Sequence, residues 1–230
     1  MSSALQDVSE VHQNHSDLPE KVLPGGIPRQ ISTRQILNAA EKIFSRDGFK
    51  GASMTAIARE AKLPKANIHY YFKTKEDLFR ATLEYNVIAW LSDADHWFTT
   101  DRHPRDAFTG YIRAKLRHAH DNPDASRLFT QEMLQGAPHL HHYLSTELRR
   151  HVEDRKIIFQ TWTEKGLMAE TDAAHLMFCL WSITQAYADT GLQLALVLGQ
   201  EKLTEHDFET AARTLADIIL VGVLPNAIPQ

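Results

Sequence analysis

Apolar residues recur at intervals of three and four along most of this chain, and no segment shows the alternation typical of a half-buried strand. The first such segment predicts a helix that begins near Ser32 or Thr33 and ends at Gly48. Its buried face is expected to consist of Ile36, Ala39, Ala40, Ile43 and Phe44. The spacing therefore predicts an all-α fold.

Capping residues and prolines predict eight further helices. Ser53 caps a short second helix, Pro64 opens a third within its first turn, and Thr74 caps a long fourth helix that extends through Leu91. Five more are expected at about 105–120, 124–135, 138–165, 171–198 and 204–222. Residues 1–30 are polar, lack helical periodicity and are predicted to form a disordered tail.

The composition favours an intracellular globular protein. Hydrophobic residues make up 43% of the 230 residues, which is enough to bury a sizeable core. No run of 18 apolar residues and no signal peptide is visible, so neither a membrane span nor export is expected. Cys179 is the single cysteine, which excludes an internal disulfide and fits the reducing cytoplasm, the localisation we expect.

Charge is unevenly distributed although the net charge is only -4. Residues 31–82 contain ten lysines and arginines against five acidic residues, whereas residues 83–230 contain 13 basic and 20 acidic residues. A small basic module is thus joined to an acidic body, which indicates a polyanionic partner for the module. On charge alone, an ordinary solvated face is an equal alternative.

Residues 53–72 combine a short helix, a sharp turn and another short helix, the pattern of a helix-turn-helix. The first residues of the second helix in such a motif face base edges in the major groove. Asn67 suits a bidentate contact to adenine, and His69 suits a base or a phosphate. Phosphate contacts are expected from Lys65, Tyr70, Tyr71 and Lys75. The surface expected to face DNA is completed by Ser53, Thr55 and Ala66.

Two apolar residues of the same helix, Ile68 and Phe72, are four positions apart and are expected to face the core of the module. Either tyrosine of the pair Tyr70 and Tyr71 has a structural alternative, in which its ring packs against this core.

Residues 48–79, GFKGASMTAIAREAKLPKANIHYYFKTKEDLF, resemble the DNA-binding domain of the TetR family of transcriptional regulators. The resemblance lies in Ile57-Ala58, Tyr70-Tyr71-Phe72, Lys73-Thr74-Lys75 and Asp77-Leu78. It implies a three-helix helix-turn-helix domain at 31–78 and a helical ligand-binding and dimerisation domain at 79–230. The chain departs from the family pattern at Lys62, where glycine is usual, and at Pro64, where serine is usual. A left-handed backbone at Lys62 would cost about 1 kcal/mol.

The predicted helix at 171–198 is apolar on nearly all sides, and the last helix adds a further apolar face. A helix that is apolar all round must be buried on all sides. In this family such helices pair two subunits, so we expect a homodimer that binds an inverted-repeat operator in double-stranded DNA. Packing within the monomer core is the alternative use of this surface.

Polar residues within apolar helices are candidates for a ligand pocket. Trp181, Thr184, Gln185 and Ala188 share a helix face, with Phe178 one turn before. The null hypothesis for Gln185 is that it hydrogen-bonds a neighbouring backbone group.

Residues 111–116, 123–138 and 175–189 are similar to pyrimidine-utilisation regulators of the same family. That similarity implies uracil or thymine as effector, with Trp90, Trp181 and Gln185 as pocket residues. Arg127 and Glu132 also match, either as ligand contacts or as a structural ion pair. A different planar or amide ligand remains the alternative.

Enzymatic and metal-binding functions have weaker support in the sequence. There is no glycine-rich phosphate loop, nucleophile elbow or catalytic triad order. The 13 histidines lack the cysteine or paired carboxylate partners of a metal site, and no cofactor is expected. A helical adaptor would explain the acidic body but not the cluster of Asn67, His69 and lysines.

Overall fold

The computed structural model describes residues 27–225, in which all regular secondary structure is helical. The helices are α1 (Ile27–Gly51), α2 (Met54–Glu60), α3 (Lys65–Tyr71), α4 (Lys75–Trp97), α5 (Pro104–Asp121), α6 (Pro123–Leu134), α7 (His141–Tyr143), the π-helical turn η1 (Leu144–Leu148), α8 (Arg149–Glu164), α9 (Ala173–Asp189), α10 (Gly191–Val197) and α11 (Glu205–Val223). Within these residues no helix combines the length and the apolar character needed to cross a bilayer.

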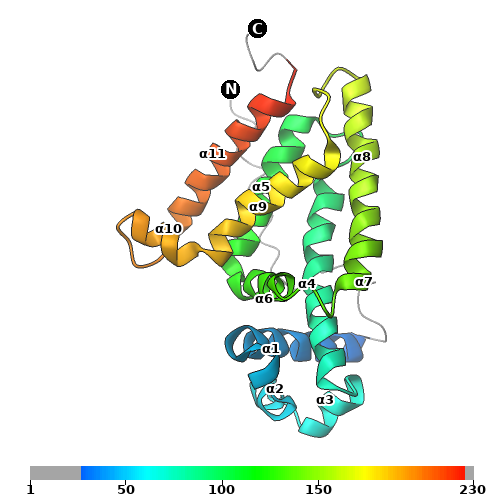
Figure 1. The fold of residues 1–230 in the computed structure, drawn as a ribbon, viewed down its shortest axis with the longest axis vertical. Coiled ribbons are helices and arrows are strands. Elements are labelled where there is room, and N and C mark those ends of the chain that lie inside the picture. The colour runs from blue at the N-terminus through cyan, green and yellow to red at the C-terminus, as the bar shows by residue number, and fades with distance from the viewer. Residues whose placement is uncertain (1–26, 226–230) are drawn as a thin grey trace.

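Helices α1 to α3 form a small N-terminal unit, and α4 extends from it into the larger helical body (Figure 1). The core of the N-terminal unit contains Ile36, Phe44, Ile57, Ile68 and Leu83, and it also includes Leu128 of α6 and Leu140. The core of the body is built around aromatic residues of α5 and α8 with Phe98 between them. Because α6 contributes to the first core, the N-terminal unit and the body share a packed boundary.

Helix α1 begins at Ile27, about five residues before the predicted start. Residues 27–30 are therefore helical, and the prediction that the tail extends to residue 30 is wrong for these four positions. The rest of the predicted tail lies outside the described residues. Gly48 kinks the helix with a φ of 69°, at the position where the sequence predicts its end.

Two long predicted helices are interrupted. The expected helix at 171–198 divides into α9 and α10 at Thr190 and Gly191. Asp189, at the end of α9, accepts hydrogen bonds from the hydroxyls of Ser126 and Thr130, at 2.8 and 2.6 Å, and Gly191 is a poor residue for continuing the helix. The expected helix at 138–165 begins at His141 and contains the π-helical turn η1.

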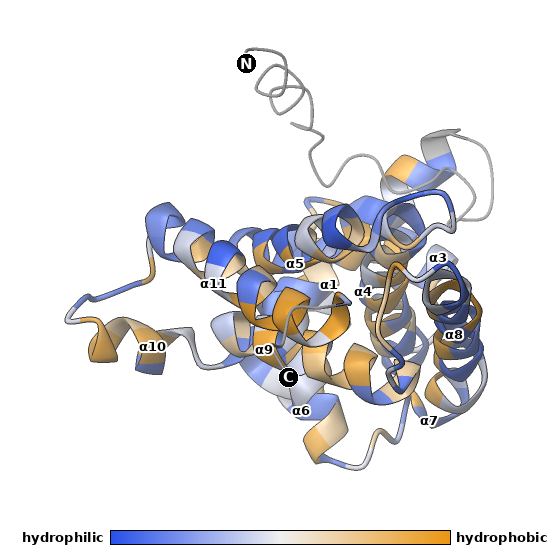
Figure 2. Ribbon diagram, turned by 90° about the horizontal axis from the view of Figure 1, so that it is seen from above, coloured by the Kyte–Doolittle hydropathy of each residue, from blue (hydrophilic) through white to orange (hydrophobic). Residues whose placement is uncertain are grey.

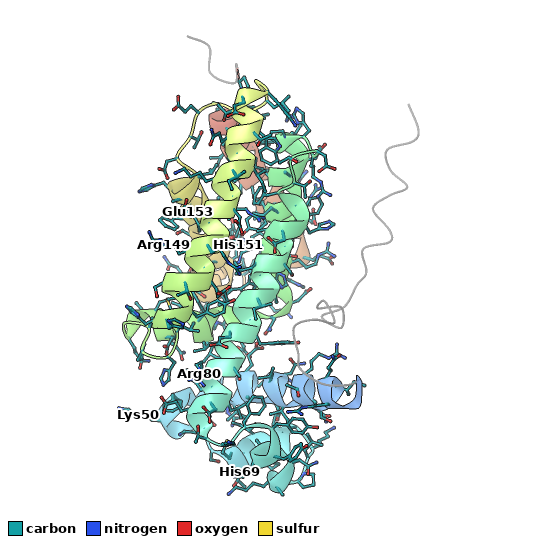
Figure 3. All side chains as sticks on the ribbon, turned by 90° about the vertical axis from the view of Figure 1, so that its right-hand side faces the viewer. Lys50, His69, Arg80, Arg149, His151 and Glu153 are labelled. Carbon is teal, nitrogen blue, oxygen red and sulfur yellow. The ribbon has the colours of Figure 1, made fainter. Side chains whose placement is uncertain are left out.

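Helix α8 is held against α4 by Arg155, whose guanidinium donates to the carbonyl of Ala94 at 2.7 Å and to Asp95 at 2.9 Å. His151, one turn earlier, lies between the two helices (Figure 3). Burial, followed by the charge of Arg155, lowers the pKa of His151. The contacts of Arg155 with Ala94 and Asp95 hold the C-terminal half of α4 against the body.

The turn between α2 and α3 contains Lys62 and Pro64, the two residues that differ from the family pattern. Lys62 has a φ of 53°, so the left-handed conformation considered for the sequence is present without glycine. Ser53 caps α2 by accepting from the amide of Ala56 at 3.1 Å, as predicted. Pro64 lies at the N-cap of α3 and not within its first turn, and it supplies no side-chain cap.

Replacing Lys62 with glycine is expected to raise stability by about 1 kcal/mol, because glycine adopts positive φ without the steric cost of a Cβ atom. For a chain of this size the midpoint of thermal unfolding should rise by about 2–4 °C. Lys62→Ala is the matched control, since alanine removes the charge but keeps the Cβ atom. Equal melting temperatures for the glycine and alanine variants would contradict the strain at this turn.

Candidate functional site

Helix α3 presents a polar face to solvent at the tip of the N-terminal unit, where His69 is labelled in Figure 3. Ile68 is fully buried and Phe72 packs against the same core, as predicted. Tyr70 is 72% exposed. The residues of the expected DNA surface that are exposed are Ser53, Thr55, Lys65, Ala66, Asn67, His69 and Tyr70. The motif therefore displays the residues that a recognition helix needs.

Tyr71 differs from Tyr70 because its ring is half-buried against the core of the N-terminal unit. The Tyr70 ring meets it edge-on with centroids 5.2 Å apart, and the guanidinium of Arg29 lies 5.8 Å from its centre. Tyr71 thus supports Tyr70 from behind, which is the structural alternative considered for one member of the pair.

Lys75 was expected to contact phosphate, and the structure contradicts this. Its ammonium donates to the backbone carbonyls of Phe49 at 2.7 Å and Ala52 at 3.0 Å. It also lies 4.6 Å from the centre of the Phe49 ring. These carbonyls follow the kink at Gly48 near the end of α1. Lys75 is therefore a cap within the domain.

A cavity of about 20 Å³ lies between α4, α5, α6 and α9. Its lining residues are Trp90, Lys115, His118, Ala119, Asn122, Ser126 and Gln185. The volume has room for about one water molecule, well below the several hundred Å³ typical of sites for small organic ligands. Admission of a ring therefore requires outward movement of at least one wall.

Trp90 and Gln185, two of the six predicted pocket residues, line this cavity. Trp181 instead packs against the core of the body and donates from Nε1 to the Tyr111 hydroxyl at 3.0 Å. Phe178 is 48% exposed on the outside of α9.

Thr184 and Ala188 are buried, but neither lines the cavity, and the Thr184 hydroxyl donates to the carbonyl of Leu180. Phe178, Trp181, Thr184 and Ala188 therefore do not line this cavity, and their assignment to an effector pocket stays a prediction.

The Gln185 side chain is oriented by a polar chain that connects α9 with α6. Its Nε2 donates to the Thr130 hydroxyl at 2.8 Å, which in turn donates to Asp189 at 2.6 Å. This use of the amide donor leaves the amide oxygen of Gln185 as an available acceptor. The alternative for Gln185 was a hydrogen bond to a neighbouring backbone group, but its amide donates to the side chain of Thr130.

Lys115 is the main site residue that the sequence analysis missed. Lys115 is half-buried, and desolvation lowers the pKa of its ammonium to about 8 although the charges of Asp93 and Asp189 oppose this shift. It lies 4.8 Å from the centre of the Trp90 ring, in the geometry of a cation–π contact. His118, one turn further along α5, contacts Asp93 through Nε2 at 2.6 Å. The sequence did contain a signal for this site, because the polar residues Lys115, His118 and Asn122 share one helix face.

Arg127 and Glu132 do not form the ion pair that was one alternative for them. Arg127 lies 3.7 Å from Asp124 and donates to the carbonyl of Ala188 at 3.2 Å. Glu132 is 2% exposed and accepts from the backbone and side-chain nitrogens of His139, at 2.6 and 3.1 Å. The His139 ring packs against Phe49 and Phe79. Glu132 thus secures a contact between the body and the N-terminal unit.

The cavity wall also reaches the N-terminal unit through Asn122. The Asn122 amide lies beside the carboxyl group of Glu41, which is on α1 and only 7% exposed. Burial raises the pKa of Glu41, and the amide partly offsets this effect. A displacement of Asn122 would therefore act directly on α1.

Within residues 27–225 no three histidine, cysteine, aspartate or glutamate side chains come together as a metal site would require.

The sequence matches two family models that together span most of the chain. Residues 36–82 match the model of bacterial regulatory proteins of the tetR family, and residues 83–226 match the YcdC-like C-terminal region. The HTH-type transcriptional regulator RutR of Escherichia coli strain K12 is 37% identical over 200 residues, which covers 86% of this chain and 94% of that protein. The repressor NicS of Pseudomonas putida is 46% identical over 50 residues, covering 22% of this chain and 24% of NicS.

Solved structures support the same fold. A putative fatty acid metabolism regulator from Clostridium perfringens has a TM-score of 0.63 at 18% identity, covering 84% of this chain and all of that one. The regulator PfmR from Thermus thermophilus also has a TM-score of 0.63 at 19% identity, and the match covers 88% of this chain and all of the PfmR chain. Together, the helix-turn-helix, the helical body and these matches show that the chain belongs to the TetR family of bacterial transcriptional regulators.

Proposed function

We propose that this regulator is a homodimeric repressor that binds an inverted-repeat operator through α3 and is controlled by a pyrimidine such as uracil or thymine. The observation that carries the proposal is the contact between the cavity wall and α1, which joins a ligand site to a DNA-binding unit. A different planar or amide ligand is the alternative effector. The relatives are named as regulators, which favours a non-enzymatic role in the cytoplasm.

DNA recognition is assigned to the exposed face of α3. Asn67 reads adenine through its paired donor and acceptor, and His69 supplements it. Lys65 and Tyr70 hold phosphates and thereby fix the register of the helix, with Ser53, Thr55 and Ala66 beside them. Tyr71 and Lys75 act indirectly by supporting this surface.

Dimerisation is assigned to α9, α10 and α11. Their large apolar side chains that are about half exposed or more are Phe178, Leu192, Leu196, Val197, Leu198, Ile218 and Val221. Helix α10 projects from the body and is strongly apolar (Figure 2). Because the monomer core leaves this surface in water, a second copy of the chain is its proposed cover. Two recognition helices on a dimer must lie about 34–36 Å apart to reach successive major grooves.

The effector is assigned to the small cavity. A pyrimidine ring presents carbonyl acceptors and NH donors, which complement the Lys115 ammonium and the Gln185 amide oxygen. Trp90 supplies a flat aromatic wall. The resemblance to pyrimidine-utilisation regulators favours this ring over other planar ligands.

Coupling between the sites follows from the size of the cavity. A ring that enters must displace a wall, and the walls include Trp90 on α4 and Asn122 beside Glu41 of α1. Helix α4 starts four residues after α3 ends, so its tilt changes the position of α3. The effector can shift this equilibrium only by its differential affinity for the two arrangements, typically 1–3 kcal/mol.

Substitutions on α3 test the assignment of DNA contacts. Asn67→Ala should cost about 1–3 kcal/mol on the preferred operator and remove the preference at one base pair, because the bidentate contact is lost. Lys65→Met should weaken binding to all sequences and reduce the slope of affinity against salt by about one. Lys156→Met, an exposed lysine on α8, is the control and should change neither quantity. Unchanged base preference in Asn67→Ala would overturn the role of Asn67.

Gln185→Leu tests the effector site. Saturating uracil should change the operator affinity of the wild-type protein by about 5–150-fold. Gln185→Leu should abolish this response while keeping affinity for the operator without uracil. Gln160→Leu, an exposed glutamine on α8, is the matched control. If Gln185→Leu and the wild type respond equally, Gln185 does not bind the effector.

The lowered pKa of Lys115 predicts a pH dependence of stability. The folded protein releases the Lys115 proton near pH 8, whereas the unfolded chain holds it until about pH 10.5. The unfolded state therefore binds more protons in this window, and stability should increase as pH rises above about 8.

This contribution can be measured by urea unfolding of the wild type and Lys115→Met at about pH 7.5, 8.5 and 9.5. These values stay below the range in which tyrosine titrates. The rise should be smaller in Lys115→Met and unchanged in Lys156→Met. The same rise in all three proteins would show that the pKa of Lys115 is not lowered in the folded protein.

A further inference from the structure

A second hollow lies at the end of the body remote from α3. It is an open groove of about 510 Å³ between the end of α4, the first half of α5 and the middle of α11. Trp97 is the last residue of α4, about 33 Å along that helix from its start. The volume falls in the range of sites for small organic molecules. No residue of the groove belongs to the effector cavity.

Three arginines line the groove, Arg105 and Arg113 from α5 and Arg213 from α11. Among residues 27–225 none of these three guanidiniums has an ion pair within 4.0 Å, and Arg213 makes one long hydrogen bond, to Thr210 at 3.5 Å. Asp106 and Asp217 also line the groove, so its charge is net positive. This is unusual on a body in which residues 83–230 hold 13 basic and 20 acidic residues.

An apolar wall accompanies the charges. Trp97, Ala216 and Leu220 line the groove together with Gly110. The Trp97 ring lies so close to Gly110 that a Cβ atom there would be 2.2 Å from ring carbons. The guanidinium of Arg102 lies 4.6 Å from the centre of the same ring. Trp97 is therefore fixed from two sides and cannot easily collapse into the groove.

From this combination we infer that the groove is a second ligand site, for a small organic anion with a carboxylate or phosphate head and a flat apolar body. The planar guanidinium fork binds either head group through paired hydrogen bonds. Three arginines without ion pairs supply the donors, and the fixed indole with Leu220 supplies the apolar contact. The groove spans α4 and α11, so such a ligand would join the helix that leads to α3 with a helix of the proposed dimer surface.

Titration calorimetry of the full chain tests the site with four probes. Phenyl phosphate and benzoate carry both parts of the expected ligand, inorganic phosphate lacks the apolar body, and benzamide lacks the charge. The aromatic anion with the preferred head group should bind at least about 10-fold more tightly than inorganic phosphate and benzamide. A preference for phenyl phosphate identifies a phosphate ester, and a preference for benzoate identifies a carboxylate.

Variants locate the binding. Arg113→Gln and Arg213→Gln should each weaken the preferred probe about 10-fold, because each removes a charge-assisted contact. Arg149→Gln, an exposed arginine on α8, is the charge-matched control and should bind like the wild type. Gln185→Leu should also bind normally, which separates this site from the effector cavity. Absence of binding by the wild type, or equal affinity in Arg113→Gln, Arg213→Gln and Arg149→Gln, would overturn the inference.

Discussion

The packing of one helix into two cores is the constraint on which the architecture depends. Leu78, Phe79 and Leu83 of α4 are buried in the core of the N-terminal unit, and Ala94 is buried in the core of the body. The helix has 23 residues, about 35 Å, without an internal break. A displacement of its distal half must therefore be transmitted to its first turns or absorbed by repacking one of the two cores. Close-packed cores resist such repacking, so the rigid alternative is favoured.

A second contact between the units is polar and has a different character. Glu41 is a buried carboxyl group on α1, and its neighbour Asn122 belongs to the wall of the effector cavity. Glu132 and His139 form a further buried pair beside Phe49 and Phe79. Buried polar contacts lose more free energy than apolar ones when their geometry changes. The junction is thus sensitive to small movements, whereas the apolar packing of α4 transmits them.

Local signals in the sequence predicted the local structure. The caps Ser53 and Thr74 and the buried position of Ile68 all depend on residues close by in the chain. Of the two predicted residues that line the cavity, Gln185 was predicted because an amide is unusual within an apolar helix, whereas Trp90 was implied only by the resemblance to related regulators. Lys75 was misassigned since its partners, the carbonyls of Phe49 and Ala52, become close only through the kink in α1. Similarly, nothing near Lys115 in the chain shows that Trp90 covers its ammonium.

In the proposed mechanism, the effector cavity controls the distance between the two recognition helices of a dimer. Electron spin resonance can measure that distance with a label at Arg59→Cys, an exposed position on α2, in a Cys179→Ser background that removes the exposed native thiol. We expect an intersubunit distance that shifts when uracil is added to the labelled protein and does not shift when the protein also carries Gln185→Leu. An identical distance distribution with and without uracil, or the absence of any intersubunit signal, would contradict it.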